Sequence, residues 1–232
     1  MIIHFTDKFN NLKSIISSKS FLLNYCGEYF GDKKGNVVSR AAHPMVSFSD
    51  YSDNDLPSKT ITYGSYGIAL HKDWAKFNGL SPVNYIEKNS PAALGLIALL
   101  RSRQVGTLPK HLRLPVIQLK CFTKHVYGYN SYFNDKDFDF KSENEWRFVP
   151  TKKQIGGNRI SVNLSIYSKK KTKYNEKIKL YSLKFSLGDI KYIYVKNELE
   201  RQQLISDFSL SQRQVKIATW KNVNKVTKPS SN

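Results

Sequence analysis

Two glutamates, Glu143 and Glu145, stand one residue apart in a segment that alternates apolar and charged side chains as far as Pro150. This alternation predicts a strand, and side chains two positions apart on a strand share one face, so we expect the two carboxylates to lie together. Such a pair can hold a ribose diol and stabilise positive charge at the anomeric carbon as a leaving group departs. The alternative is structural: Glu143 lies in solvent at the strand end, and Glu145 pairs with Arg147 or a nearby lysine.

Three further side chains are candidates for the same site. His4 interrupts the apolar strand predicted over residues 2–5, and Tyr63 and Tyr66 flank Gly64 at the start of a strand predicted over residues 63–70. A core strand ordinarily carries apolar side chains at such positions, so an imidazole or a phenol there indicates a use other than packing. The candidate site therefore depends on whether the fold brings His4, a tyrosine and Glu145 to one cleft.

Several other chemistries have no support in the sequence. No two of the five histidines have the spacing of a zinc-binding pair, and Cys26 and Cys121 are too far apart in sequence for a zinc motif. The chain also lacks a P-loop, a Gly-x-Gly-x-x-Gly turn and a Gly-x-Ser-x-Gly nucleophile elbow. We therefore expect no metal site, and two reduced thiols.

The charge of the chain favours anionic partners. There are 37 Lys and Arg against 18 Asp and Glu, a net charge of +19, and residues 151–232 carry 18 basic against 5 acidic side chains, a net of +13. A cluster in this part pairs lysines with two tyrosines, Tyr167 and Tyr174, and predicts contacts to nucleic acid by phosphate binding and stacking. The alternatives are solvated lysines and the tip of a hairpin. The lysines of the cluster are Lys169, Lys170, Lys171 and Lys173.

The elements that must position these side chains follow from periodicity and from turn and cap residues. Helices are predicted over residues 9–18, 73–77 and 90–103, with a further helix capped by Asn197. Surface loops are predicted over 27–42 and 50–60, and a mobile insert over 127–141. Strands are predicted over 2–5, 45–48, 63–70, 83–86, 116–122, 143–150, 159–166, 178–185, 190–195 and 215–220.

No repeat or linker divides the chain. We therefore predict one α+β domain over residues 1–228, with the candidate motifs in residues 1–150, a basic, strand-rich part over 151–228 and a frayed tail over 229–232. A content of 40% hydrophobic and 24% charged residues is typical of a soluble globular protein. The longest apolar run is about half of a bilayer span, and the first residues do not resemble an export signal. We expect a cytoplasmic protein with no membrane contact.

Five motifs occur in order along the first 150 residues. In them the chain resembles the AbiGi family of bacterial abortive-infection proteins, antitoxins of phage-resistance systems. The resemblance implies a defence protein that acts as an antitoxin-like or regulatory component, with a cognate toxin encoded nearby. The motifs are His4–Thr6, Pro44–Asp50, Tyr63–Trp74, Pro82–Tyr85 and Glu143–Pro150.

The first and last of these motifs also resemble a broader group of domains that share the ADP-ribosyltransferase fold, an α+β domain with a central antiparallel or mixed split sheet. The Ser-Thr-Ser element of that group is absent between His4 and the glutamates. The resemblance implies a site for NAD, in which His4 and Thr6 meet the adenosine ribose and Tyr63 or Tyr66 stacks on nicotinamide. Glu145 holds the nicotinamide ribose, and Glu143 orients the acceptor.

Two functions of different classes follow. The first is a binding protein on a degenerate enzyme fold, which restrains a toxin or binds nucleic acid and needs no cofactor. The second is an active NAD-dependent ADP-ribosyltransferase that modifies a nucleic acid or a protein.

Overall fold

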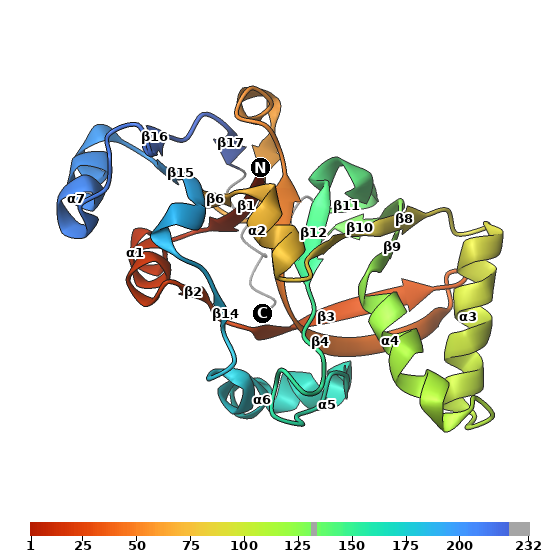
Figure 1. Ribbon diagram of the computed structural model, residues 1–232. Helices are drawn as coiled ribbons and strands as arrows, with labels where there is room; N and C mark the ends of the chain where they lie inside the picture. The colour runs from red at the N-terminus through yellow and green to blue at the C-terminus, as the bar shows by residue number, and fades with distance from the viewer. Residues whose placement is uncertain (131–133, 223–232) are drawn as a thin grey trace, which may run out of the picture.

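A nine-stranded mixed sheet runs through the molecule, whose computed structural model describes residues 1–130 and 134–222 (Figure 1). Sheet neighbours are antiparallel apart from the parallel pair β15 and β16. With the helices described below, this arrangement confirms the predicted α+β class and mixed central sheet. The main path is β16 (Val215–Ile217), β15 (Ile190–Val195), β6 (Tyr66–Leu70), β1 (Ile2–Thr6), β4 (Val37–Asp50), β12 (Glu145–Phe148) and β7 (Ser81–Pro82).

Strand β4 joins two parts of this sheet. Residues 37–45 pair with β3 (Asn24–Gly31), and the short β13 (Val162–Asn163) joins the same part. Residues 46–50 pair instead with β12 on one side and β1 on the other. The partners of β4 therefore change near Ser47, and β1, β3 and β12 all approach this point.

Strand β1 has packed side chains on both faces. Ile2 belongs to the main hydrophobic core, whereas Ile3 and Phe5 belong to a second cluster around Tyr194 and Trp220. Because successive side chains of a strand point to opposite faces, His4 and Thr6 share the face of Ile2. Two candidate residues are thereby placed on the face of the main core.

Seven α-helices, four short 3-10 helices and four two-stranded ribbons complete the elements of the described residues. The helices are α1 (Phe9–Ser18), α2 (Lys72–Phe77), α3 (Pro91–Gln104), α4 (Arg113–Cys121), α5 (Leu164–Lys169), α6 (Lys171–Ile178) and α7 (Glu198–Phe208). The ribbons are β2 (Ser20–Phe21) with β14 (Leu183–Lys184), β5 (Thr60–Ile61) with β17 (Lys221–Asn222), β8 (Asn84–Ile86) with β9 (Thr123–His125), and β10 (Tyr127–Asn130) with β11 (Asp135–Asp139).

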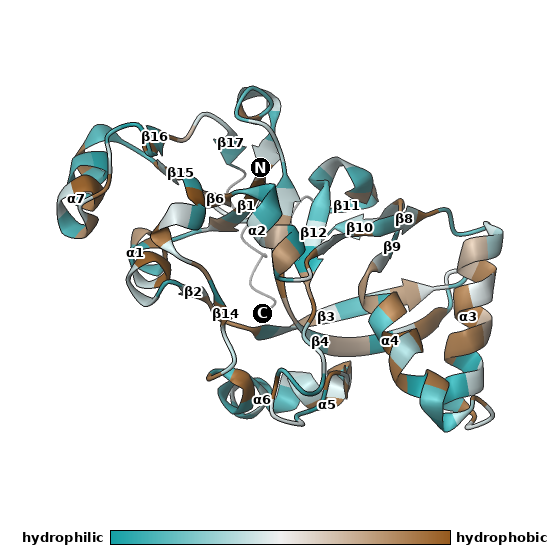
Figure 2. Ribbon diagram, in the orientation of Figure 1, coloured by the Kyte–Doolittle hydropathy of each residue, from teal (hydrophilic) through white to brown (hydrophobic). Residues whose placement is uncertain are grey.

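Six of the seven α-helices of the described residues lie around the sheet in three groups, and α2 lies apart from them (Figure 1). Helices α1 and α7 contact each other beside β6 and β15, α5 and α6 contact β4 and β3, and α3 contacts both α4 and β4. Helix α3 begins as predicted, with the Ser90 hydroxyl accepting a hydrogen bond from the Ala93 amide at 3.2 Å and Pro91 in the first turn. Figure 2 shows apolar residues along both α3 and α4.

The surface loop predicted over residues 27–42 is wrong. These residues form the end of β3, a turn and the start of β4, which pair from Gly31 and Val37 onward. Glycines and polar residues suggested a loop, but the turn needs only Asp32 to Asn36, because the Asp32 carboxylate accepts hydrogen bonds from the Lys34 and Asn36 amides at 3.0 and 2.9 Å.

The strand predicted over residues 116–122 is also wrong, since this segment lies in α4. Its buried residues are Val116, Ile117, Lys120 and Cys121, which is the spacing of one helix face rather than of alternating strand faces. Pro115 falls in the first helical turn, where proline is tolerated.

Two of the strands predicted in the basic part form over only two residues each. Only 162–163 and 183–184 form strands within the ranges 159–166 and 178–185, and α5 and α6 occupy most of residues 164–178. Asn163 accepts a hydrogen bond from the Ser165 amide and starts α5, a cap that strand periodicity does not reveal. Within the described residues 151–222 the basic part is therefore not strand-rich, and the prediction of Lys169–Lys173 as a hairpin tip is wrong.

The insert predicted over residues 127–141 contains β10 and β11, and its residues 131–133 lie outside the described part of the chain. The tail predicted over 229–232 lies outside it as well. Within residues 1–130 and 134–222, no helix has the length and apolar character needed to span a bilayer.

Candidate functional site

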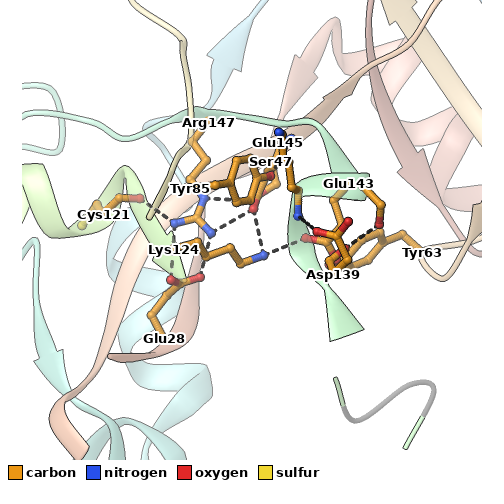
Figure 3. Close-up of polar contacts among 12 residues, drawn as sticks. Glu28, Ser47, Tyr63, Tyr85, Cys121, Lys124, Asp139, Glu143, Glu145 and Arg147 are labelled. Atoms are coloured by element: carbon orange, nitrogen blue, oxygen red, sulfur yellow. Dashed lines mark hydrogen bonds and ion pairs between the residues drawn. The ribbon is translucent and has the colours of Figure 1, made fainter. Parts of the chain in front are cut away.

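An arginine on β12 lies at the centre of a buried ionic network. The Arg147 guanidinium is 1% exposed and donates to both carboxylate oxygens of Glu28 on β3, at 3.3 and 2.9 Å. It also donates to both oxygens of Glu145, at 2.8 and 3.0 Å, and to the carbonyl of Cys121 at 2.5 Å (Figure 3). Arg147 thus ties β3, β12 and the end of α4 together, through bidentate contacts that a guanidinium is shaped to make.

A lysine on β9 joins the two glutamates of the motif. The Lys124 ammonium lies 2.7 Å from Glu143 Oε2 and 3.0 Å from Glu145 Oε2 (Figure 3). Burial opposes its charge, but the neighbouring carboxylates outweigh burial and raise the pKa of Lys124 above its usual value. Glu143 and Glu145 therefore share one cation.

Glu145 is a fully occupied carboxylate. Oε1 accepts hydrogen bonds from the Ser47 hydroxyl and Arg147 Nε, each at 2.8 Å, and Oε2 accepts from Lys124 and Arg147 at 3.0 Å. Burial alone would raise the pKa of Glu145, but the charges of Arg147 and Lys124 lower it to about 2. The ion pairs that the sequence left as an alternative are thus present, with both cations at once.

Glu143 has a different environment. It ends a 3-10 helix, Phe140–Glu143, and Asn144 with φ of 44° separates it from β12, so the prediction that one strand carries both glutamates is wrong. The phenol of Tyr63 donates to Glu143 Oε1 at 3.4 Å. Burial, together with the charge of Glu145, raises the pKa of Glu143 despite the charge of Lys124. Two neighbouring carboxylates whose pKa values shift in opposite directions are suited to different roles in proton transfer.

His4 lies against the point where β4 changes partners. Its Nδ1 is 3.0 Å from the Ser47 carbonyl, which accepts a hydrogen bond from Nδ1–H, and its ring packs edge-on against Phe21 and Phe48. Burial lowers the pKa of His4, so the neutral ring is favoured. In this tautomer Nε2 is an acceptor.

These side chains line one cavity of about 710 Å³, within the size range of small-molecule sites. Strands β1, β3, β4 and β12 and helix α1 contribute to its walls. Tyr66 is not among the described residues that line it: its hydroxyl donates to Glu200 on α7 at 2.8 Å. The candidate residues that the fold does bring together here are His4, Thr6, Tyr63, Glu143 and Glu145.

The lysine cluster lies elsewhere. Lys169–Lys173 spans the junction of α5 and α6, and its lysines are exposed. Tyr167 beside it is buried and donates to the carbonyl of Tyr25 at 2.8 Å. The cluster therefore offers cations, whereas the ring of Tyr167 is occupied by the core.

Sequence reasoning missed Glu28, Ser47 and Lys124 as members of this site. Glu28 fell within a predicted loop, and Lys124 followed a segment mistaken for a strand. The available signal was the aromatic, strand-favouring character of Tyr25, Tyr29 and Phe30 around Glu28, although the glycines nearby obscured it.

The family model described as "Putative abortive phage resistance protein AbiGi, antitoxin" matches residues 19–196. A relative named abortive phage resistance protein AbiGi, from Lactococcus lactis subsp. cremoris, is 28% identical over 212 residues, which cover 80% of this chain and 85% of the relative. No solved structure matches the chain.

The family match contains the ionic network but begins after β1, so His4 and Thr6 lie outside it. It also extends beyond residue 150, further into the basic part than the motifs alone indicated. Because the match spans well over half of its residues, the chain belongs to the AbiGi family of abortive phage resistance proteins.

Proposed function

We propose that this chain is the antitoxin-like component of a phage-defence system and binds a toxin protein encoded nearby. The family description, which names an antitoxin, supports this proposal. The observation that carries it is the surface of α3, α4 and the turn between them, which holds six of the 17 exposed large hydrophobic side chains of the described residues. These six are Leu94, Leu99, Val105, Leu112, Leu114 and Leu119.

Basic side chains accompany these apolar ones. Arg101, Arg103, Lys110 and Arg113 lie on the same helices and turn, and no acidic residue occurs between Pro91 and Cys121. A partner that fits this surface has apolar side chains surrounded by carboxylates, because complementary charge steers association and opposes wrong partners. We infer a toxin with an acidic, partly apolar face.

The state of Glu145 supports binding rather than catalysis. A carboxylate offers about four lone-pair sites, and Ser47, Lys124 and Arg147 together donate four hydrogen bonds to Glu145. A ribose hydroxyl would have to displace one of these donors. This occupancy is consistent with a degenerate domain of ADP-ribosyltransferase type that has kept its architecture.

A second candidate is an active NAD-dependent ADP-ribosyltransferase, which the cavity favours. There, His4 Nε2 can accept a hydrogen bond from a ribose hydroxyl, and the raised pKa of Glu143 suits a general base. In this reaction the bond between ribose C1 and nicotinamide breaks, nicotinamide leaves with the electron pair, the acceptor atom bonds to C1, and Glu143 takes the acceptor proton. Lys124 stays paired with Glu145 throughout.

Co-expression tests the antitoxin proposal. Each open reading frame adjacent to this gene is induced in a bacterial host with and without the chain, and growth is followed. One neighbour is expected to arrest growth alone and to be tolerated with the chain, and Leu94→Lys with Leu119→Lys is expected to abolish this rescue. Leu180→Lys, at an exposed leucine away from α3 and α4, is the matched control. Rescue that survives the double substitution contradicts the proposed surface. If the chain relieves the toxicity of none of the neighbouring gene products, the proposed function is contradicted.

The second candidate is tested through Glu143 rather than Glu145, because Glu145 also holds Arg147 in the core. If the chain is a transferase, Glu143→Gln abolishes nicotinamide release from NAD while Glu176→Gln, at an exposed glutamate on α6, has no effect. Toxin neutralisation that is unchanged by Glu143→Gln shows that the antitoxin function needs no transferase activity.

A further inference from the structure

A second cavity, of about 950 Å³, adjoins the ionic network. It lies between the β3–β4 hairpin and the β10–β11 ribbon, and it shares Glu28, Tyr63, Lys124 and Glu143 with the cavity already described. The two cavities therefore share part of their lining. We call this second cavity the tyrosine groove.

Tyrosines give the groove its character. Among the described residues, all of the exposed tyrosines line it, and they come from three separate segments of the chain. One of these rings already carries a cation, since the Arg40 guanidinium lies 5.1 Å from the centroid of Tyr29. Exposed aromatic rings gathered in one concavity exceed what core packing needs, because packing would bury them. The four are Tyr29, Tyr63, Tyr127 and Tyr129.

Lysines stand at the rim of the groove. Lys33, Lys34 and Lys88 line it, are exposed, and form no ion pair within the described residues. The turn that carries Lys33 and Lys34 is held by Asp32, whose carboxylate also pairs with Arg101 at 3.0 Å. The acidic charge of this turn is thus already neutralised, and the ammonium groups of Lys33 and Lys34 remain available to an anion.

We propose that the tyrosine groove binds single-stranded nucleic acid. The bases of the nucleic acid stack on the tyrosine rings, and its phosphates contact Lys33, Lys34 and Lys88. Proteins that bind single strands combine aromatic stacking with a cationic groove in this way. A duplex keeps its bases stacked inside and cannot present their faces to rings in a concavity. An acidic protein segment would satisfy the lysines but would not use the exposed faces of the tyrosine rings.

This inference is independent of the antitoxin proposal, because the groove and the α3–α4 surface use different residues. It also differs from the lysine cluster at Lys169–Lys173, which supplies cations without the ring of Tyr167. A strand in the groove would lie beside Glu143, since that residue lines both cavities.

Fluorescence anisotropy of labelled oligonucleotides of about 12 nucleotides, oligo-dT and oligo-U, with the full-length chain tests the proposal. Tyr127→Ala with Tyr129→Ala is expected to weaken single-strand binding about tenfold or more while leaving binding of a duplex of equal length unchanged. Lys33→Gln with Lys34→Gln is expected to lower the slope of log affinity against log salt by about 1.4, because each phosphate contact to a single strand contributes about 0.7. Circular dichroism confirms that each variant is folded.

The matched control is Lys152→Gln with Lys153→Gln, which removes the same charge from an exposed turn that does not line the groove. If this control weakens binding as much as the substitutions of Lys33 and Lys34, the interaction is diffuse and the groove proposal is overturned. Equal losses of single-strand and duplex binding in the tyrosine variant overturn it too. Polyglutamate that displaces the oligonucleotide at equal charge indicates an acidic protein partner instead. The co-expression assay with the groove variants shows whether they still relieve toxicity. It thereby distinguishes a failure of the nucleic-acid proposal from a failure of the antitoxin proposal.

Discussion

The substitution Arg147→Met removes a guanidinium that makes five hydrogen bonds inside the protein. Methionine fills much of the same volume, so the main change is electrostatic. Glu28 and Glu145 lose their shared cation, and Lys124 remains as the nearby positive charge. We expect a large loss of stability, because a buried carboxylate without its partner is costly.

Two independent figures give the size of this loss. Removing one partner of a buried ion pair costs about 3–5 kcal/mol. The cations around Glu145 lower its pKa from 4.5 to about 2, which corresponds to about 3 kcal/mol at neutral pH. Arg147 and Lys124 both contribute to the second value, but Arg147 also forms an ion pair with Glu28. We therefore expect the free energy of unfolding to fall by about 3 kcal/mol or more, a large part of the stability of an ordinary domain.

The effect has a defined pH dependence. The pKa of Glu145 is lower in the folded chain than in the unfolded chain, so its stabilising contribution is complete above about pH 4.5 and is lost as the pH falls toward 2. In the Arg147→Met variant the carboxylates take up protons at higher pH, which relieves their unpaired charge. The difference in unfolding free energy between wild type and variant should therefore shrink as the pH falls from 7 to 4.5.

Urea unfolding followed by tryptophan fluorescence at both pH values measures this difference. Arg101→Met is the control, because Arg101 is 58% exposed and pairs with Asp32 at the surface, where ion pairs contribute little. An Arg147→Met loss at pH 7 no greater than that of the control, or a loss that does not change with pH, would refute the proposed role of the network.

Three further predictions concern single positions. Gly64→Ala should lower the free energy of unfolding by well over about 1 kcal/mol, because φ is +134° and the added Cβ would lie 2.0 Å from a backbone oxygen of β1. Gly35→Ala, where φ is +83° and the added Cβ meets open space, should lower it by only about 1 kcal/mol. Thermal denaturation of the two variants compares these losses. Burial lowers the pKa of Lys120, so the unfolded chain binds that proton more tightly and the stability of the wild-type protein rises with alkaline pH. Lys120→Met should keep or raise stability at pH 7 and should remove this rise, which urea titrations at pH 7 and 9 measure. Ser90→Ala should cost about 1 kcal/mol and fray α3, a loss that hydrogen exchange of its first turn would detect, and unaltered exchange would contradict the cap.

Much of the fold could be predicted from local patterns. The helices at 9–18 and 90–103 follow from periodicity and from the cap at Ser90, and the helix after Asn197 follows from its cap. The strands around 2–5 and 190–195 follow from their apolar character. Each of these signals depends on residues a few positions apart, which is why a single sequence contains it.

Helix α4 and the β3–β4 hairpin could not be predicted in this way. In α4, Lys120 occupies a buried position, with its Nζ 3.3 Å from Nε2 of His43 on β4. A polar residue therefore interrupts the apolar periodicity of the helix, and the segment that contacts it is far away in sequence. In the hairpin, the glycines and charged residues are typical of a loop, and the segment becomes a strand because its backbone pairs with the partner strand.

The candidate site shows the same division. The sequence pointed to Glu143, Glu145 and His4, and it offered the pairing of Glu145 with Arg147 as one of two interpretations. That Glu28 and Lys124 complete the network depends on contacts between β3, β9 and β12, which are far apart along the chain. Whether a charged side chain is solvated or buried beside an opposite charge depends on which distant segment packs against it, so only the folded chain decides the protonation and the availability of these carboxylates.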